Sequence, residues 1–371
     1  LMQIEGFVAK GYEPVRDAFA RNFDESLENG AAFAACIEGE PVVNVWAGYT
    51  DRVRTKAWAH DTLVPVHSTT KPIAALIVAM LVEKGKLNYD QPVAATWPEF
   101  GAEGKDQVTL GQALSHQAGV PGFLERIDTA LWLDPPALSA ELAKLKPLWA
   151  PGTACGYHAM TYGYIAGEMV RRVSPRSLGT ILREDICEPL GIDFWIGLPD
   201  SEHGRCAEQQ LPRDMPDLGP ITDAKRAAFF VPWAAPRTDA AWRRAEIPSA
   251  NGHGTALSVA QLFAAFANAG KIGDMRVLDP GIFAELTAQR INADDLVMPF
   301  RMSWAAGVMI NNNKIYGPNA RTLAHAGRGG SFGLGDPTRG LSAGYVLNKL
   351  APALQTDERG QRLIAALYSC M

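Results

Sequence analysis

The 371-residue chain has no excess of positive charge, no paired cysteines and no metal-binding histidine pattern, and each absence excludes a class of protein. A formal net charge of −5 leaves no basic surface for a nucleic-acid partner. The five cysteines are odd in number and include no Cys-x-x-Cys pair, so neither a disulfide framework nor a zinc site is expected. The seven histidines lack His-x-x-x-His spacing, and we expect neither a metal nor another cofactor.

The N-terminus and the apolar segments predict a protein without a membrane partner. Residues 2–6 lack the basic start and the long apolar run of a signal peptide, so we expect a cytoplasmic protein. The ten apolar residues 73–82 are too few to span a bilayer. A hydrophobic content of 47% and a charged content of 20% are typical of a globular chain with one large or two ordinary domains. The sequence does not determine the oligomeric state.

The chain is organised around residues 67–72, with the sequence His-Ser-Thr-Thr-Lys-Pro, and the apolar run that follows. Because residues 73–82 show no polar stripe, they predict a helix buried inside a globular domain. Proline is tolerated only in the first turn of a helix, so Pro72 places residues 68–70 at the N-terminus of this helix. We expect Gly85 as the C-cap.

Ser68 and Lys71 are three residues apart, which places both side chains on one face of a helix. The serine hydroxyl would lie beside an ammonium group and the unpaired N–H groups of the helix start. In a site that excludes water, desolvation favours a neutral Lys71, which could accept the proton of Ser68. The alternative is a capping serine and an unrelated surface lysine, since Ser-x-x-Lys occurs by chance about once in a chain of this length.

The hydrophobic patterns predict strands near both ends of the chain and helices between them. Val15, Phe19 and Phe23 share one face of a helix within residues 12–29, and residues 31–37 and 41–46 form an antiparallel hairpin. Further helices are expected at 108–116, 161–173, 177–190, 258–269 (capped by Ser258) and 356–368. Further strands are expected at 305–310, 321–325, 329–334 and 341–347.

This order of elements predicts an α/β (α+β) fold with two domains. Residues 1–87 and 250–371 would form an α/β domain with an antiparallel sheet, and residues 88–249 an inserted, mainly helical domain. Residues 199–250 show little periodicity, and we interpret them as an insertion or lid. Trp233 and Trp242 in this stretch could wall a substrate pocket.

A second candidate nucleophile is Ser331, because residues 329–333 fit the Gly-x-Ser-x-Gly pattern of α/β-hydrolases. In those enzymes an acid and a histidine follow the serine in the chain. Asp336 and Asp357 lie downstream, but no histidine follows His325. In α/β-hydrolases this serine also lies on a sharp turn between a strand and a helix, the nucleophile elbow. Ser331 instead lies among glycines and short strands. The alternative interpretation is a glycine-rich strand edge near the pocket.

Three motifs together resemble those of the penicillin-recognising serine enzymes. Residues 67–71, then Tyr157-His158-Ala159, then His325-Ala326-Gly327 follow the order and rough spacing of that superfamily. The flanking stretches 114–119, 149–157, 251–255 and 329–348 also resemble it, from about residue 25 to the end of the chain. The chain is most similar to family VIII carboxylesterases, which resemble class C β-lactamases and DD-peptidases. The resemblance implies a β-lactamase/DD-peptidase-like fold, with an antiparallel sheet flanked by helices and an inserted helical domain.

The resemblance implies an acyl-enzyme mechanism on Ser68. Lys71 and Tyr157 would share the proton transfers, because a phenol whose pKa is lowered by a neighbouring ammonium can act first as base and then as acid. Which of the two is the formal base stays open. Without the resemblance, the favoured interpretation of Tyr157 is a buried aromatic residue at a helix entry.

The resemblance also implies an oxyanion hole and a substrate-binding strand. The oxyanion hole would consist of the backbone N–H groups of Ser68 and Arg328, and His325 and Gly327 would contact substrate. Two positions depart from the β-lactamase pattern: Ala159 replaces an asparagine that holds a side-chain amide, and His325 replaces a lysine that helps to bind a carboxylate. Without the resemblance, His325 could be a hydrogen-bonded strand histidine.

These residues predict a serine esterase that hydrolyses short-chain carboxylic esters, a small-molecule substrate class. One alternative is a β-lactamase or DD-peptidase-like hydrolase of β-lactams or peptides, and weak β-lactamase activity could also accompany the esterase. The other alternative is a catalytically idle homologue of the penicillin-binding proteins.

Overall fold

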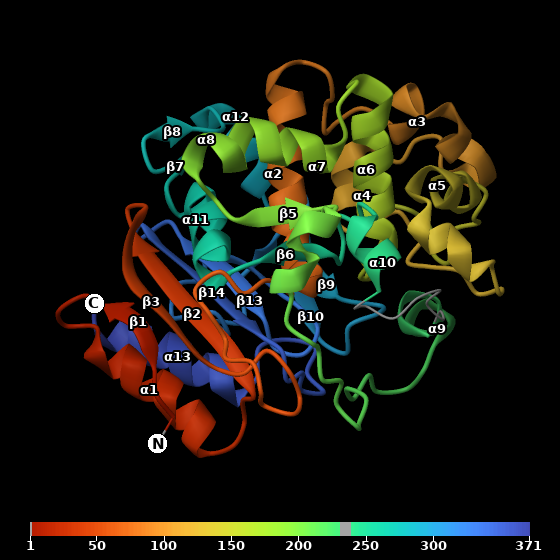
Figure 1. Ribbon diagram of the computed structural model, residues 1–371. Helices are drawn as coiled ribbons and strands as arrows, with labels where there is room; N and C mark the ends of the chain where they lie inside the picture. The colour runs from red at the N-terminus through yellow and green to blue at the C-terminus, as the bar shows by residue number, and fades with distance from the viewer. Residues whose placement is uncertain (1, 231–238) are drawn as a thin grey trace.

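The computed structural model describes residues 2–230 and 239–371, which are arranged around a nine-stranded antiparallel sheet (Figure 1). The strand order is β1-β3-β2-β14-β13-β12-β11-β10-β9. Strands from both ends of the chain therefore build one sheet, as the sequence predicts. The strands are β1 (Glu5–Val8), β2 (Gly30–Ile37), β3 (Glu40–Gly48), β9 (Ile291–Asp294), β10 (Arg301–Trp304), β11 (Met309–Ile310), β12 (Leu323–Ala326), β13 (Phe332–Asp336) and β14 (Leu341–Leu347).

Helices cover both faces of this sheet, and β2 shows how its sequence separates the faces. Successive side chains of a strand point to opposite faces, and the odd-numbered residues 31, 33 and 35 belong to one hydrophobic core while residues 32, 34 and 36 belong to the other. The first core includes the apolar faces of α1 (Glu13–Asp24) and α13 (Glu358–Ser369). The second includes α11 (Ala256–Ala267) on the opposite face (Figure 1). The mixed α/β (α+β) fold with a flanked antiparallel sheet is confirmed.

The remaining helices lie mainly beyond the α11 face of the sheet (Figure 1). They are α2 (Thr70–Glu83), α3 (Val93–Thr96), α4 (Leu110–Leu114), α5 (Pro135–Ala143), α6 (Thr161–Val173), α7 (Leu178–Ile181), α8 (Glu188–Leu190), α9 (Asp223–Phe229), α10 (Ala240–Arg244) and α12 (Pro280–Thr287). Short 3-10 segments are η1 (His67–Thr69), η2 (Pro98–Gly104), η3 (Thr129–Leu133) and η5 (Asp200–Arg205).

The apolar run at residues 73–82 forms a buried helix, α2, as the sequence predicts. Every residue of α2 from Thr70 to Leu81 is buried, as expected for a helix that is hydrophobic on all sides. A 3-10 turn, η1, precedes it and contains Ser68. The helix ends at Glu83, Lys84 caps it, and Gly85 follows with the left-handed φ of 66° that glycine adopts without strain.

Three predicted elements differ from the structure. The helix expected at 177–190 is interrupted by a π-helical segment (Leu182–Cys187) between α7 and α8. The strand expected at 305–310 contains a turn, because the N–H of Ala305 bonds the carbonyl of Val308, and only β11 follows it. Helix α11 is capped by Thr255, whose hydroxyl accepts from the N–H of Ser258, so Ser258 completes a capping box and is not the cap.

Two small sheets complete the fold. Strand β6 (Gly252–Gly254) pairs with β4 (Val64–Pro65) and with β5 (Phe194–Ile196), and β7 (Lys271–Ile272) pairs with β8 (Met275–Arg276). The sheet of β4, β6 and β5 joins the two regions that the sequence assigns to separate domains, and that division stays a prediction. Across residues 2–230 and 239–371, no helix has both the length and the apolar character needed to cross a membrane.

Candidate active site

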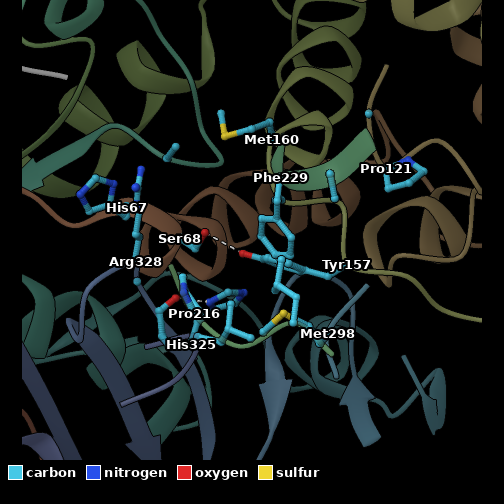
Figure 2. Close-up of a pocket in the computed structure, with 18 of the residues that line it drawn as sticks. His67, Ser68, Pro121, Tyr157, Met160, Pro216, Phe229, Met298, His325 and Arg328 are labelled. Atoms are coloured by element: carbon cyan, nitrogen blue, oxygen red, sulfur yellow. Dashed lines mark hydrogen bonds between the residues drawn. The ribbon is translucent and has the colours of Figure 1, made fainter. Parts of the chain in front are cut away.

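The structure brings the three predicted catalytic side chains together at the start of α2. The Oγ atom of Ser68 accepts a hydrogen bond from the Nζ atom of Lys71 at 2.9 Å. It accepts another from the hydroxyl of Tyr157 at 2.6 Å (Figure 2). Ser68 and Lys71 lie one helical turn apart, whereas Tyr157 arrives from a loop just before α6. The serine oxygen is therefore held between an amine and a phenol.

Lys71 is fully buried, and its surroundings determine what it presents to Ser68. Its Nζ atom also donates to the carbonyl oxygens of Ala159 at 2.8 Å and Ser249 at 3.0 Å. A carbonyl oxygen can only accept, so these two bonds use two Nζ protons. The third position faces Ser68 and carries a proton in the ammonium or a lone pair in the amine. Burial lowers the pKa of Lys71 well below its ordinary value, which favours the amine.

Tyr157 is positioned by two residues that the sequence did not identify. Its ring stacks on Trp304 with centroids 5.6 Å apart and planes at 4°, and its backbone N–H donates to Oδ1 of Asp295 at 2.9 Å. The other carboxylate oxygen of Asp295 accepts from the Trp304 indole at 3.2 Å. Asp295 thus fixes both the tyrosine and the ring that supports it. The only signal in the sequence was an acidic residue at the start of the apolar run 296–300.

The predicted lowering of the Tyr157 pKa is wrong, because burial raises the pKa of this phenol above its ordinary value. Lys71 lies over the face of the ring, with Nζ 4.7 Å from the centroid. The bond from the phenol to Ser68 lowers the pKa by less than burial raises it. Tyr157 is therefore a neutral proton donor at pH 7.

Ser68 opens onto a cavity of about 310 Å³. Most of its lining is apolar, and part of it comes from the stretch 199–250: Met215, Pro216, Leu218, Ala227, Ala228 and Phe229. Trp242 does not line this cavity, because it is fully buried with its ring edge-on to His253. Trp233 lies outside the described residues. That the stretch moves as a lid stays a prediction.

Comparison with known proteins identifies the family. Residues 19–367 match the family model described as Beta-lactamase. The chain belongs to the β-lactamase family. It is 32% identical over 361 residues to the "Esterase/beta-lactamase LipL" of Mycobacterium tuberculosis (strain ATCC 25618 / H37Rv), a match that covers 92% of this chain and 82% of LipL.

Two solved structures of this family are similar along their whole length. A penicillin-binding protein homologue from Caulobacter crescentus has 50% sequence identity and a TM-score of 0.97, and a family VIII carboxylesterase has 42% identity and a TM-score of 0.94. Both matches cover 100% of each chain. The predicted resemblance to this superfamily, including family VIII carboxylesterases, is confirmed.

The third motif of this β-lactamase-family chain lies on β12, beside Ser68. His325 lines the cavity, and burial lowers its pKa to about 3, so the ring is neutral at pH 7. Its Nδ1–H donates to the carbonyl of Ala326 at 2.7 Å, which leaves the Nε2 lone pair without a partner in residues 2–230 and 239–371. His325 is thus an acceptor where the β-lactamase pattern has a cation.

Gly327 is required by the close approach of two chain segments. A Cβ atom at this position would lie 2.1 Å from the Ser331 hydroxyl and 2.3 Å from the carbonyl of Val66, two residues before Ser68. The N–H of Gly327 donates to the carbonyl of Ser331 at 2.7 Å, which closes the turn. The following residue, Arg328, lines the cavity, but the role of its N–H in an oxyanion hole stays a prediction.

Ser331, the alternative nucleophile, does not have the surroundings of one. Its hydroxyl donates to the carbonyl of Val66 at 3.1 Å, and it lies 3.5 Å from the hydroxyl of Thr69. The strand that follows, β13, turns into β14 and not into a helix. The nucleophile elbow that the Gly-x-Ser-x-Gly pattern suggests is therefore absent at Ser331. Among the described residues, no cluster of three or more His, Cys, Asp or Glu could hold a metal.

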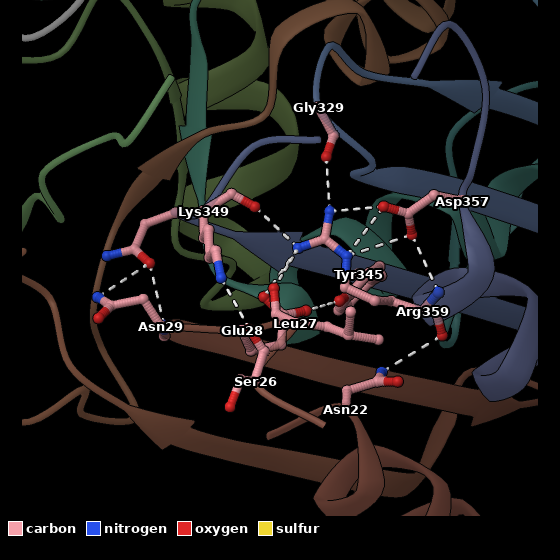
Figure 3. Close-up of polar contacts among 12 residues, drawn as sticks. Asn22, Ser26, Leu27, Glu28, Asn29, Gly329, Tyr345, Lys349, Asp357 and Arg359 are labelled. Atoms are coloured by element: carbon pink, nitrogen blue, oxygen red, sulfur yellow. Dashed lines mark hydrogen bonds and ion pairs between the residues drawn. The ribbon is translucent and has the colours of Figure 1, made fainter. Parts of the chain in front are cut away.

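The turn at residues 327–330 is held from behind by a buried arginine of α13 (Figure 3). Arg359 donates to the carbonyl of Gly329 at 2.8 Å and to that of Lys349 at 2.8 Å. It also forms ion pairs with Glu28 at 3.0 Å and Asp357 at 2.7 Å. The Arg359 guanidinium is almost completely buried, and its N–H groups donate to carboxylate and carbonyl oxygens. It therefore supports the turn beside Ser68 rigidly.

Proposed function

We propose that this protein is a serine hydrolase of short-chain carboxylic esters that acts through an acyl-enzyme on Ser68. The observation that carries the proposal is the pair of hydrogen bonds on Ser68 Oγ, one from Lys71 and one from Tyr157. The names of LipL and of the family VIII carboxylesterase support an esterase within this family.

Acylation would begin with proton transfer from Ser68 to Lys71. The two carbonyl partners of Lys71 direct the amine lone pair at the serine hydroxyl, and burial, which lowers the pKa of Lys71, favours this neutral amine. Ser68 Oγ then bonds the acyl carbon, and the bond from that carbon to the alcohol oxygen breaks. Tyr157, which is neutral and already donates toward Ser68 Oγ, gives its proton to the leaving oxygen. The Lys71 ammonium restores the proton of Tyr157.

Deacylation would run the same relay with water in place of the alcohol. Water gives up one proton to the Tyr157 and Lys71 pair, attacks the acyl carbon and releases the carboxylic acid, and Ser68 regains its proton. The N–H groups of Ser68 and Arg328 would stabilise the oxyanion in both steps. Arg359 would keep the turn that carries Arg328 in place.

Two side chains support esters over β-lactams as substrates. Ala159 has no amide to bind a substrate side-chain amide, and His325 is neutral where the β-lactamase pattern has a lysine. A small ester needs neither contact, because the nucleophile and the oxyanion hole act on the ester group itself. Weak β-lactamase activity belongs to the same proposal, since the name of LipL includes both activities.

The test compares kcat/KM for p-nitrophenyl acetate and butyrate with kcat/KM for the chromogenic cephalosporin nitrocefin in one preparation. We expect the esters to be hydrolysed well and nitrocefin poorly or not at all. An efficiency on nitrocefin equal to that on the esters would make the protein a β-lactamase. A catalytically idle homologue is distinguished by a fluorophosphonate probe, which would fail to label Ser68.

A further inference from the structure

Arg328 is a cation without a partner at the wall of the active-site cavity. It follows β12 directly and lines the cavity together with Ser68 and His67. Its side chain is half-buried, and no ion pair or hydrogen bond of its guanidinium is found with any described residue. Because burial of an unpaired charge costs free energy, an anion bound at this position would offset that cost.

Nothing else in the described lining supplies a lasting charge. Within residues 2–230 and 239–371, the lining contains no aspartate or glutamate, and Arg328 is its only arginine or lysine. His67 and His325 are neutral at pH 7, because burial lowers the pKa of each to about 3. An anionic group that enters the cavity would meet one guanidinium and no carboxylate. A neutral substrate would leave this guanidinium without a partner.

The position of Arg328 indicates which part of an ester it would contact. In Figure 2 its side chain and His67 lie on one side of Ser68, and Tyr157 lies on the other. Tyr157 must face the oxygen of the leaving alcohol if it is to protonate it. The alcohol is therefore directed toward Tyr157, and the acyl group extends toward Arg328.

We propose that Arg328 binds a carboxylate at the far end of the acyl group, so that the preferred substrates are monoesters of short dicarboxylic acids. This inference rests on the proposed esterase function. A carboxylate is planar and accepts two parallel N–H bonds from a guanidinium, which gives both strength and orientation. The side chain of Arg328 belongs to the residue whose backbone N–H is expected in the oxyanion hole and lines the same cavity as Ser68, so we assign it a short acyl chain and test the four-carbon succinyl group.

The experiment uses two esters that differ in one group. The p-nitrophenyl monoester of succinic acid carries a carboxylate where p-nitrophenyl butyrate carries a methyl group, and the leaving group is the same. The measured quantity is the ratio of kcat/KM for the succinate monoester to kcat/KM for butyrate, with spontaneous hydrolysis subtracted. The ratio cancels any change in folding or in the shared catalytic steps.

Three variants accompany the wild-type protein. Arg328→Met keeps the length of the side chain without its charge, and we expect the ratio to fall about 10- to 100-fold, the usual range for loss of a charge-assisted bond. Arg328→Lys should recover part of the ratio. Arg321→Met removes an exposed arginine elsewhere and should leave the ratio unchanged.

The outcomes separate the inference from the proposed function. A ratio that stays within twofold in Arg328→Met, or that falls equally in Arg321→Met, would overturn the inference while butyrate hydrolysis still supports the esterase. Failure of the wild-type protein to hydrolyse either ester would overturn both.

Discussion

Basic side chains lie on both sides of the turn at residues 327–330, but only those on one side have carboxylate partners among the described residues. Behind the turn, Arg359 is 2% exposed and binds two carboxylates and several carbonyl oxygens (Figure 3). In front of it, Lys71 and Arg328 have no carboxylate partner among the described residues. Charges that serve only the fold are compensated within the chain. Basic groups without a carboxylate partner next to a cavity are available for the reaction: the Arg328 guanidinium for an anionic group of the substrate, and the Lys71 amine for a proton.

The largest expected effect is the loss of ester hydrolysis when Ser68, on the cavity side of the turn, is replaced. Ser68→Ala should abolish ester hydrolysis, because no other group receives hydrogen bonds from Lys71 and Tyr157 together in the described residues. Ser331→Ala is the matched control, since this hydroxyl bonds a backbone carbonyl, and much of the activity should remain. The measurement is turnover of p-nitrophenyl butyrate together with fluorophosphonate labelling. Loss of labelling in the Ser331 variant but not in the Ser68 variant would reverse the assignment.

The second effect tests whether Lys71 and Tyr157 form one relay. Lys71→Ala and Tyr157→Phe should each lower kcat by about 100- to 10,000-fold, the range for general acid–base groups. The double variant should be little slower than the worse single variant, because members of one unit act non-additively. Losses that multiply in the double variant would show two independent roles.

A control for Lys71 exists in the same chain. Lys105 also donates to two backbone carbonyls, but it lies outside the cavity lining. Lys105→Ala should therefore lower stability without a comparable fall in kcat for the folded protein. An equal fall in kcat would mean that loss of a buried lysine, and not loss of a base, explains the Lys71 result.

The third effect compares the two arginines directly through stability. Arg359→Met should lower the free energy of unfolding by about 3–5 kcal/mol, because it leaves the buried Glu28 without its cation and also removes the ion pair with the partly exposed Asp357. Arg328→Met should change it by less than about 1 kcal/mol, since no described partner is left behind. Urea unfolding at pH 7.5 measures both. Equal losses would remove the distinction between a structural and a ligand-binding arginine.

The smallest effect concerns a proton. Burial lowers the pKa of His253 on β6 to about 3, against 6.5 for an ordinary histidine. In the unfolded chain the His253 ring is therefore protonated near pH 6.5, whereas in the folded chain it stays neutral down to about pH 3. The free energy of unfolding falls as the pH drops from 6.5 to 3. His253→Asn should reduce the loss of unfolding free energy between pH 7.5 and 5.5 by about 1 kcal/mol. An unchanged pH dependence would show that the pKa of the ring is the same in the folded and unfolded states.

The sequence predicts those helices and strands whose buried faces show as a regular spacing of apolar residues. The apolar run 73–82, the Val15-Phe19-Phe23 face and the alternation in β2 each follow from burial. Ser68 and Lys71 are close because one helical turn joins them. Only the family resemblance connected them to a tyrosine 89 residues away.

The missed features depend on contacts between distant segments. The carbonyls of Ala159 and Ser249 that bind Lys71 are backbone groups, and any residue could supply them. Asp295 supports Tyr157 only because β9 and β10 bring residues 295 and 304 beside it. The direction of the Tyr157 pKa shift could not be predicted either, because it depends on burial, which the sequence does not give for a single residue and which raises the pKa by more than the bond to Ser68 lowers it.

The close packing at Gly327 has a consequence for laboratory evolution. Any side chain at this position would collide with the backbone segment just before the nucleophile, so the requirement does not depend on which compound is hydrolysed. A library randomised at residues 325–328 should therefore return glycine at 327 under every selection for turnover. At position 328 the recovered residues should instead differ according to the acyl group used for selection. Position 328 is therefore the first position to vary when the substrate preference is to be changed.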